Sequence, residues 1–144
     1  MKREYPDRPI VGVGGVVIKG DRVLLVRRGG EPLKGEWSIP GGTLELGEEL
    51  AAAARRELKE ETGLEVEPLE VLGVFDRIIR DGRKIRYHYV IVDYACRLKG
   101  GKLAPASDVL DARWVRRKDL ARYRLTRIAT SVIRRGFRLF NKKD

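Results

Sequence analysis

Apolar runs, separated by glycine, proline and aspartate, divide the chain into short segments. Four runs are rich in β-branched side chains, and each of two neighbouring pairs flanks a short segment centred on glycine and aspartate. We therefore expect two antiparallel hairpins, with two shorter strands elsewhere. The expected strands cover residues 11–18, 23–27, 71–79 and 84–96 in the hairpins, and 37–40 and 112–115 as the shorter pair.

Two other segments have the composition or spacing of helices. Residues 48–62 contain no proline or glycine and stop before Gly63, the usual position of a C-terminal cap. Residues 126–140 repeat apolar side chains at helical spacing. Gly41 and Gly42 predict a loop with unusual backbone angles before the first helix. This order of elements predicts an α/β (α+β) fold, with helices packed on a mixed sheet.

Length and composition limit the class of protein. The 144 residues fit one domain, 1–144, and the one cysteine, Cys96, excludes an internal disulfide. The first residues lack the apolar run of a signal peptide, so we expect a cytoplasmic location. The run 11–18 is far shorter than the ~20 residues that cross a bilayer. The net charge of +10 favours anionic partners, which include nucleic acid, a membrane surface and phosphorylated small molecules.

The end of the first predicted helix carries an unusual group of glutamates. Within the stretch RRELKEETG, Glu57 and Glu61 fall in the arc that should be apolar, and Glu60 lies beside it. Glu57 and Glu61 are a like-charge pair, and the negative end of the helix dipole disfavours Glu60 and Glu61. An ordinary ion pair between Arg56 and Glu60 on a solvated face leaves Glu57 and Glu61 unexplained. A bound Mg²⁺ or Mn²⁺, which prefers oxygen ligands, removes these objections.

The same residues carry a resemblance to a known family. Residues 42–64 read GTLELGEELAAAARRELKEETGL, with Gly42, five residues, Glu48, seven residues, Arg56-Glu57-Leu58, one residue, Glu60-Glu61, one residue and Gly63-Leu64. The spacing matches every fixed position of the Nudix box, and the chain resembles the Nudix (MutT-like) hydrolases. The segments GEWSIPGG before the box and ARWV after it also resemble the family.

The resemblance implies an α/β/α sandwich around a mixed sheet and a function in nucleotide hydrolysis. Such enzymes cleave a nucleoside diphosphate linked to a group X, giving nucleoside monophosphate and phosphorylated X. By the same resemblance, Arg56 would hold a glutamate in place by an ion pair, and Glu48 would support the metal site. The implied Mg²⁺ ligands are Glu57, Glu60, Glu61 and the carbonyl of Gly41.

The residue that removes the proton from water is open at this stage. Some family members use a box glutamate, which corresponds to Glu57 or Glu60, and we favour Glu57. Others use an acidic residue on a loop before the late strand, which here offers Asp108 and Asp111. For each of these two taken alone, a polar loop residue that solvates a turn is the better interpretation.

Several arginines are candidates for contacts with the phosphates of the substrate. Arg27 and Arg28 end a predicted strand shortly before the box, where guanidinium groups could bind phosphate oxygens. The alternative for both is a solvated strand end. Arg8, between two prolines, is a weaker candidate of the same kind.

The identity of the substrate is not fixed by the sequence. The subfamily markers for ADP-ribose and dinucleoside polyphosphates, a proline and a tyrosine, are missing from the segment IIRDGR. We expect a small nucleotide, either ADP-ribose-like or a (deoxy)nucleoside triphosphate, and a homodimer is possible. The alternatives are a non-catalytic nucleotide sensor and a pyrophosphohydrolase of RNA 5′ ends.

A basic C-terminal segment is the only sequence feature that favours RNA. With few aromatics for stacking on bases, a solvated basic face is the better interpretation, so nucleic acid is not the expected partner. Its basic residues are Arg127, Arg134, Arg135, Arg138, Lys142 and Lys143.

Overall fold

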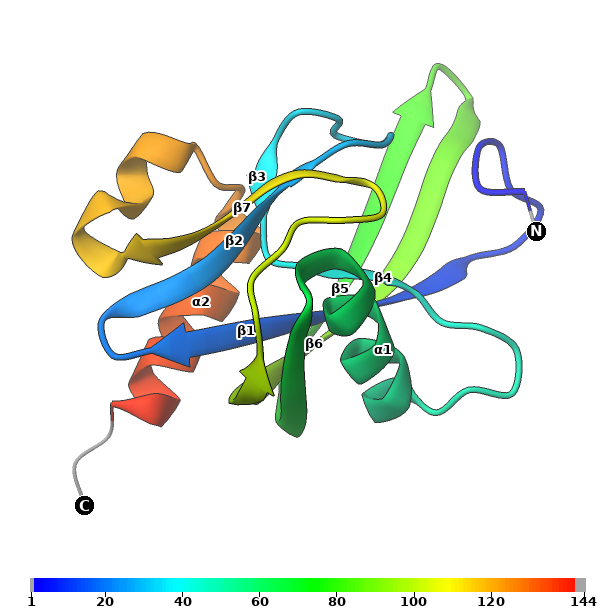
Figure 1. Ribbon diagram of the computed structural model, residues 1–144. Coiled ribbons are helices and arrows are strands. Elements are labelled where there is room, and N and C mark those ends of the chain that lie inside the picture. The colour runs from blue at the N-terminus through cyan, green and yellow to red at the C-terminus, as the bar shows by residue number, and fades with distance from the viewer. Residues whose placement is uncertain (1, 142–144) are drawn as a thin grey trace.

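A mixed sheet forms the centre of the protein, in a computed structural model that describes residues 2–141 (Figure 1). Within these residues, the strands are β1 (Ile10–Lys19), β2 (Arg22–Arg28), β3 (Trp37–Ser38), β4 (Gly41–Thr43), β5 (Leu64–Asp81), β6 (Lys84–Gly101) and β7 (Val109–Arg116). The helices are α1 (Leu50–Thr62), a 3-10 helix η1 (Arg117–Tyr123) and α2 (Arg127–Phe140).

The strands follow the order β3-β2-β1-β6-β5, with β4 added beside β1 and β7 beside β2. The pairing of β1 with β6 is parallel and the other pairings are antiparallel, so the sheet is mixed, as the sequence predicts. Both expected hairpins are confirmed. Gly20 and Gly82 lie in their turns with φ of 62° and 61°, a left-handed conformation that glycine adopts without strain.

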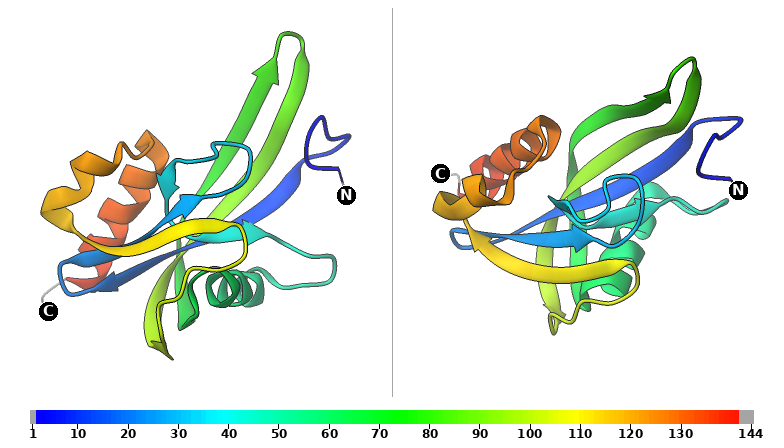
Figure 2. Two further views of the ribbon diagram at one scale, coloured as in Figure 1. Left: turned by 45° about the horizontal axis from the view of Figure 1, so that its top comes forward. Right: turned by 90° about the horizontal axis from the view of Figure 1, so that it is seen from above.

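The helices α1 and α2 cover opposite faces of the strands (Figure 2). On one face, Ala53 and Ala54 of α1 pack against Val13, and Leu58 packs in a cluster with Val17 and Leu24. On the other face, α2 buries its own apolar stripe against a different set of strand residues. That cluster contains Val16, Val23, Leu25, Val115, Val132, Ile133 and Phe137. The two cores give the α/β/α sandwich that the sequence predicts.

The ends of both helices follow local sequence signals, with one correction. Gly63 caps α1 with φ of 78°, and its N–H donates to the carbonyl of Lys59 at 2.9 Å. Thr126 caps α2 by accepting a hydrogen bond from the N–H of Ala129 at 3.1 Å. The start of α1 was predicted at Glu48 but lies at Leu50. Glu48 instead belongs to a turn, in which its N–H donates to the carbonyl of Glu45 at 3.0 Å.

The glycines before α1 also have a different role from the predicted one. Gly41 and Gly42 do not form a special loop but belong to β4, which pairs with β1. Both are needed for close approach, because a Cβ on Gly41 would collide with the backbone of Val13 and a Cβ on Gly42 would collide with the carboxylate of Glu57. The short strand therefore lies directly against β1 on one side and beneath α1 on the other.

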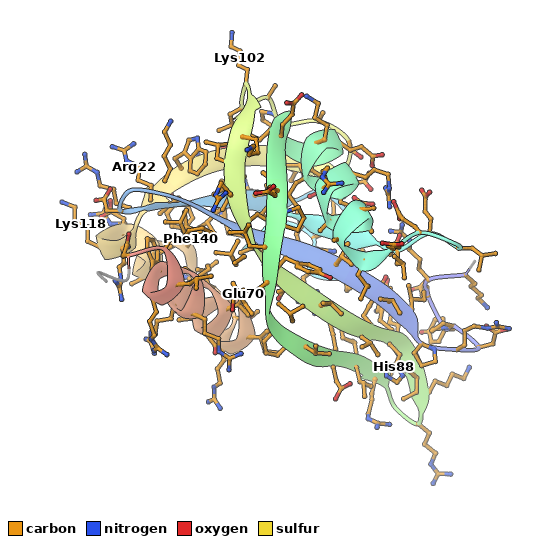
Figure 3. The ribbon with its side chains drawn as sticks, turned by 90° about the horizontal axis from the view of Figure 1, so that it is seen from below. Arg22, Glu70, His88, Lys102, Lys118 and Phe140 are labelled. Carbon is orange, nitrogen blue, oxygen red and sulfur yellow. The ribbon has the colours of Figure 1, made fainter. Side chains whose placement is uncertain are left out.

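Basic residues gather at the end of the molecule that carries the β1–β2 turn. Lys19 is opposite Arg22, and Arg22 is opposite Arg116 in the strand register. Arg22 and Lys118 project outward at this end (Figure 3). The predicted basic residues Arg127, Arg134, Arg135 and Arg138 are exposed on α2, whereas Lys142 and Lys143 lie outside the described residues. Among residues 2–141, no helix is both long enough and apolar enough to cross a membrane.

The packing of α1 against the sheet can be tested with two leucines. Leu58 is fully buried, whereas Leu46 is fully exposed. We expect Leu58→Ala to lower the free energy of unfolding by about 2–5 kcal/mol, because it removes buried contacts and leaves a cavity. Leu46→Ala, the matched control, should change it by less than about 0.5 kcal/mol. Urea denaturation of both variants measures these values, and similar losses in the two would contradict the packing described for α1.

Candidate active site

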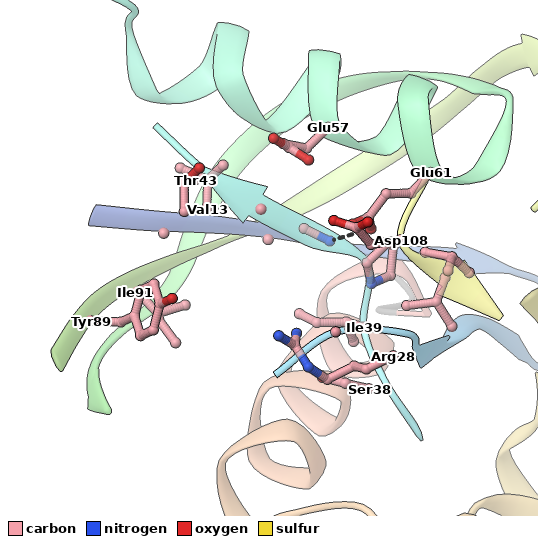
Figure 4. A pocket seen from close by; sticks show the side chains of 18 of the residues that line it. Val13, Arg28, Ser38, Ile39, Thr43, Glu57, Glu61, Tyr89, Ile91 and Asp108 are labelled. Carbon is pink, nitrogen blue, oxygen red and sulfur yellow. Dashed lines mark hydrogen bonds between the residues drawn. The ribbon is translucent and has the colours of Figure 1, made fainter. Parts of the chain in front are cut away.

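A cavity of about 330 Å³ opens between the C-terminal part of α1, the strand β4 and the sheet. Glu57 and Glu61 reach into it from α1, and Arg28 points toward it from the opposite side (Figure 4). The walls also include Glu60 and Asp108 at the acidic end. The cavity thus combines a carboxylate group at one end with a basic side chain facing it.

Arg56, in the middle of α1, contacts three of the carboxylates around this helix. Its guanidinium binds Glu48 in a bidentate manner at 2.7 and 2.8 Å, and also donates to Glu57 at 2.9 Å. A further hydrogen bond reaches the carbonyl of Thr43 at 3.0 Å, and Glu60 lies at 3.3 Å. The hydrogen bonds from Arg56 stabilise the ionised carboxylate of Glu48, and the pKa of Glu48 therefore falls to about 2. The Arg56 side chain therefore links the turn at Glu48, the strand β4 and the C-terminal half of α1.

Glu57 and Glu61 lie above the glycines of β4, one turn apart on α1. The carboxylate of Glu57 lies against Gly42, and that of Glu61 accepts the N–H of Gly41 at 3.0 Å. Burial raises the pKa of both carboxyls, to about 7 for Glu61, and the charge of Glu57 raises that of Glu61 further. Unlike Glu57, Glu61 has no ion pair with a basic side chain among residues 2–141. The two carboxylates repel each other in the absence of a cation.

The chemistry of these donors fits a hard divalent cation. Carboxylate and carbonyl oxygens are the ligands that Mg²⁺ and Mn²⁺ prefer, and the partly buried Glu61 has no ion pair with a basic side chain among residues 2–141. Within residues 2–141, no three acidic, histidine or cysteine side chains already converge in a metal-binding arrangement. Arg56 instead contacts Glu57 at 2.9 Å and Glu60 at 3.3 Å. The residues present are therefore a suitable donor set whose side chains would adjust on binding.

The structure separates the predicted arginines into two groups. Arg28 lines the cavity, and its Nε donates to the carbonyl of Pro32 at 2.9 Å. Arg27 is exposed, donates to the carbonyl of Gly35 at 3.0 Å and lies outside the cavity walls. Arg8 is also outside and pairs with Asp7 at 3.6 Å. Because neighbouring residues in a strand point to opposite sides, Arg27 and Arg28 do not both reach the cavity.

The two alternative proton acceptors are separated in the same way. Asp108 lines the cavity, and its charge acts on Glu61. Asp111 lies outside the cavity walls, and its carboxylate accepts a hydrogen bond from Arg113 at 3.0 Å. The tertiary structure therefore brings Glu57, Glu61 and Asp108 to one end of the cavity and leaves Asp111 away from it.

Sequence reasoning missed five charged residues that line the cavity: Arg3, Glu31, Glu45, Arg77 and Asp93. Arg77 and Asp93 lie on β5 and β6, where the sequence indicates only hairpin strands. The available signal was their position, because each interrupts a run of largely apolar strand residues. Arg3 had no signal of this kind, since it lies in a polar N-terminal segment.

Comparison with known proteins gives a consistent result. The sequence model described as NUDIX domain matches residues 8–136. An ADP-ribose pyrophosphatase of Methanocaldococcus jannaschii is 36% identical over 106 residues, which are 74% of this chain and 61% of that protein. A putative ADP-ribose pyrophosphatase of Bacillus subtilis, YjhB, is 35% identical over 101 residues, which are 70% of this chain and 47% of that protein. The chain thus spans from about half to three fifths of the length of these relatives.

A solved structure also matches the fold. The crystal structure of a MutT NUDIX hydrolase from Burkholderia pseudomallei superposes with a TM-score of 0.78 and 27% sequence identity. The match covers 90% of this chain and 98% of that one. The mixed sheet with a helix on each face is therefore shared along nearly the whole of both chains.

The role of Arg56 can be tested by replacing its planar guanidinium with an ammonium group, which keeps the charge. Lysine keeps the positive charge but cannot bind Glu48 with two parallel hydrogen bonds while reaching Thr43 and Glu57. We expect Arg56→Lys to lower the free energy of unfolding by about 1–3 kcal/mol, since partly buried hydrogen bonds to charged groups are lost. The exposed neighbour Arg55→Lys is the matched control and should behave like the wild type. Urea denaturation with a chelator present measures both, and equal stability of the two variants would contradict this role.

The raised pKa of Glu61 predicts a pH dependence of stability in metal-free protein. Glu61 has a pKa of about 7 in the folded protein and an ordinary value of 4.5. Between these two pH values the folded protein keeps a proton on Glu61 that the unfolded chain has released. The contribution of Glu61 to the free energy of unfolding therefore decreases as pH rises through this range. We expect Glu61→Gln to become more stable than the wild type by about 1–3 kcal/mol between pH 4 and pH 8.

The measurement is the difference in unfolding free energy between the two proteins at each pH, with a chelator present. Glu70→Gln is the control, because Glu70 is an exposed carboxylate on β5 and its replacement should change the free energy of unfolding by less than about 0.5 kcal/mol. A flat difference for Glu61→Gln would show that burial does not shift this group.

Proposed function

The chain belongs to the NUDIX domain family, and we propose that it hydrolyses the pyrophosphate bond of a nucleoside diphosphate linked to another group. The products are a nucleoside monophosphate and the phosphorylated second group. An ADP-ribose-like compound is the first candidate, because two relatives carry the name ADP-ribose pyrophosphatase. The observation that carries the proposal is the arrangement of Glu57 and Glu61 above β4, at the acidic end of a cavity that also contains arginines.

Mg²⁺, with Mn²⁺ as an alternative, is the cofactor we assign to this site. A bound divalent cation neutralises pyrophosphate charge and lowers the pKa of water. The proposed ligands are Glu57, Glu60, Glu61 and the carbonyl of Gly41. Gly41 already lies beside Glu61, through the hydrogen bond from its N–H. Glu48 supports the site indirectly, since it fixes the guanidinium of Arg56 that contacts Glu57 and Glu60.

The remaining charged groups of the cavity have roles in binding and proton transfer. Arg28 and Arg3 line the cavity and would neutralise the phosphates, because guanidinium groups form strong hydrogen bonds with phosphate oxygens. Glu57 is the proposed proton acceptor. Asp108 is the alternative acceptor on the same side of the cavity.

The full set of box residues favours an enzyme over a non-catalytic nucleotide sensor. A sensor needs only affinity, which Arg28 and Arg77 could supply without carboxylates that repel phosphate. Here Glu57 and Glu61 are buried at a cost, since burial raises the pKa of each. That cost is consistent with a site that binds a cation and performs hydrolysis.

A substrate panel tests this proposal directly. The protein is incubated with Mg²⁺ and with ADP-ribose, nucleoside triphosphates and RNA bearing a 5′ triphosphate, and released products are measured by chromatography. We expect ADP-ribose to give AMP and ribose 5-phosphate, and a chelator to abolish the reaction. Glu57→Gln should lower kcat by about 10²–10⁴-fold, the usual loss for a general base.

The controls separate the proposed roles. Glu70→Gln, at an exposed position on β5, should keep wild-type turnover. Asp108→Asn should retain most activity if Glu57 is the proton acceptor, whereas a loss confined to Asp108→Asn would transfer the role to Asp108. Tight binding of one compound with no turnover of any would favour the sensor.

A further inference from the structure

Asp93 is a buried carboxylate that the proposed hydrolysis does not use. It lies on β6 with 5% of its surface exposed and lines the cavity. Among residues 2–141, no hydrogen bond and no ion pair within 4.0 Å reaches its side chain, a rare state for a buried charged group. Among residues 2–141, every side-chain nitrogen or oxygen that is fully enclosed has a hydrogen-bond partner. The carboxylate oxygens therefore retain access to the cavity.

Glycines flank Asp93 on both neighbouring strands. Gly14 on β1 and Gly73 on β5 are its direct partners in the strand register. A Cβ on Gly14 would collide with the carboxylate of Asp93, and a Cβ on Gly73 would collide with the ring of Phe75. The two glycines therefore leave room for the Asp93 carboxylate and for the Phe75 ring on the same face of the sheet.

The walls next to Asp93 are apolar, with one basic residue. The tip of Ile39 lies near the same point above Gly14 as the Asp93 carboxylate, and Phe75 and Ile91 are opposite each other in the register. All three line the cavity. Arg77, two residues from Phe75 on the same face of β5, is the cation that acts on the charge of Asp93. The floor thus offers an acceptor and a donor between apolar side chains.

We propose that Asp93 binds the nucleobase of the substrate, by accepting hydrogen bonds from N–H groups on the edge of the base. This inference rests on the proposed function, in that the cavity holds a nucleotide. A phosphate cannot occupy this position, because an ionised carboxylate would repel it. A nucleobase has apolar faces and a polar edge, so it matches both the apolar walls and the acceptor.

The neighbouring charges make the match more specific. Arg77 can donate to a ring nitrogen or carbonyl of the base, while Asp93 accepts from an adjacent N–H. The six-membered rings of adenine and guanine present such neighbouring donors and acceptors, and an ADP-ribose-like substrate carries adenine, so we take an amino-substituted purine as the predicted ligand. A site built around a buried acceptor should discriminate strongly against a base that lacks the donor, because the carboxylate would then stay unpaired.

The test measures binding of reaction products rather than turnover, so that its outcome is independent of hydrolysis. Calorimetry at pH 8 with a chelator compares AMP and GMP with purine riboside 5′-monophosphate, which lacks the amino group, and with ribose 5-phosphate, which lacks the base. We expect the wild type to bind AMP or GMP at least about tenfold more tightly than the other two, a ratio typical of a hydrogen bond to a charged group.

Two variants of Asp93 and one control complete the experiment. Asp93→Asn and Asp93→Leu should bind AMP and GMP no more than about threefold more tightly than ribose 5-phosphate, with the melting temperature unchanged or raised, because a buried charge without a partner is removed. The control Asp76→Asn, at an exposed position on β5, should keep the wild-type preference.

Three results would overturn the proposal. The first is a wild type that shows no preference for amino purines, and the second is an Asp93→Asn variant that retains it. The third is an equal loss of affinity for all four ligands together with a lower melting temperature, which would assign Asp93 a structural role. Hydrolysis of ADP-ribose by the wild type can succeed or fail without changing any of these outcomes.

Discussion

The candidate site depends on the hydrogen bonds of one guanidinium group. Arg56 binds Glu48, Glu57 and the carbonyl of Thr43, which belong to a turn, a helix and a strand. Because its donors are fixed in one plane, these three elements are held at set distances from one another. Loss of one carboxylate would leave the partly buried guanidinium of Arg56 with fewer partners, so each contact depends on the others. Glu61 is positioned separately, by the hydrogen bond that its carboxylate accepts from the N–H of Gly41 at 3.0 Å.

Close backbone packing supplies the second constraint. Gly41 and Gly42 let β4 lie against β1 while Glu57 and Glu61 lie above it, and Gly14 and Gly73 leave room for the carboxylate of Asp93 and the ring of Phe75. At each of these positions glycine is required for the room that it leaves, and none of the four has a positive φ. The cavity is therefore shaped as much by missing side chains as by those that line it.

Charge is distributed unequally in this basic protein. The surface carries most of the net positive charge, whereas buried carboxylates are concentrated around the cavity, where burial raises the pKa of Glu57, Glu61 and Asp93. A basic exterior attracts anionic ligands over a distance of about 10 Å at moderate salt. The buried acids then require specific positive partners, which we assign to a cation at Glu61 and to N–H groups at Asp93. Long-range attraction and local selectivity thus reside in different residues.

Local signals in the sequence determined much of the secondary structure. The hairpin turns, the end of α1 at Gly63 and the apolar stripe of α2 depend on residues close together in the chain, so spacing and composition predicted them. Glutamates at helical spacing also predicted an acidic cluster, and the box gave the family. Their roles as metal ligands stay a prediction, as does the location of the protein.

Only the tertiary structure decided which other residues meet these glutamates. Arg28 reaches the cavity and Arg27 does not, Asp108 reaches it and Asp111 does not, and Asp93 enters from β6. These outcomes depend on register and on pairing between distant strands, such as the parallel pairing of β1 with β6. A shift of one residue would reverse the side to which each side chain points, and no local pattern records that choice. The sequence determined the chemistry at the acidic end of the cavity, and the fold decided what lies opposite it.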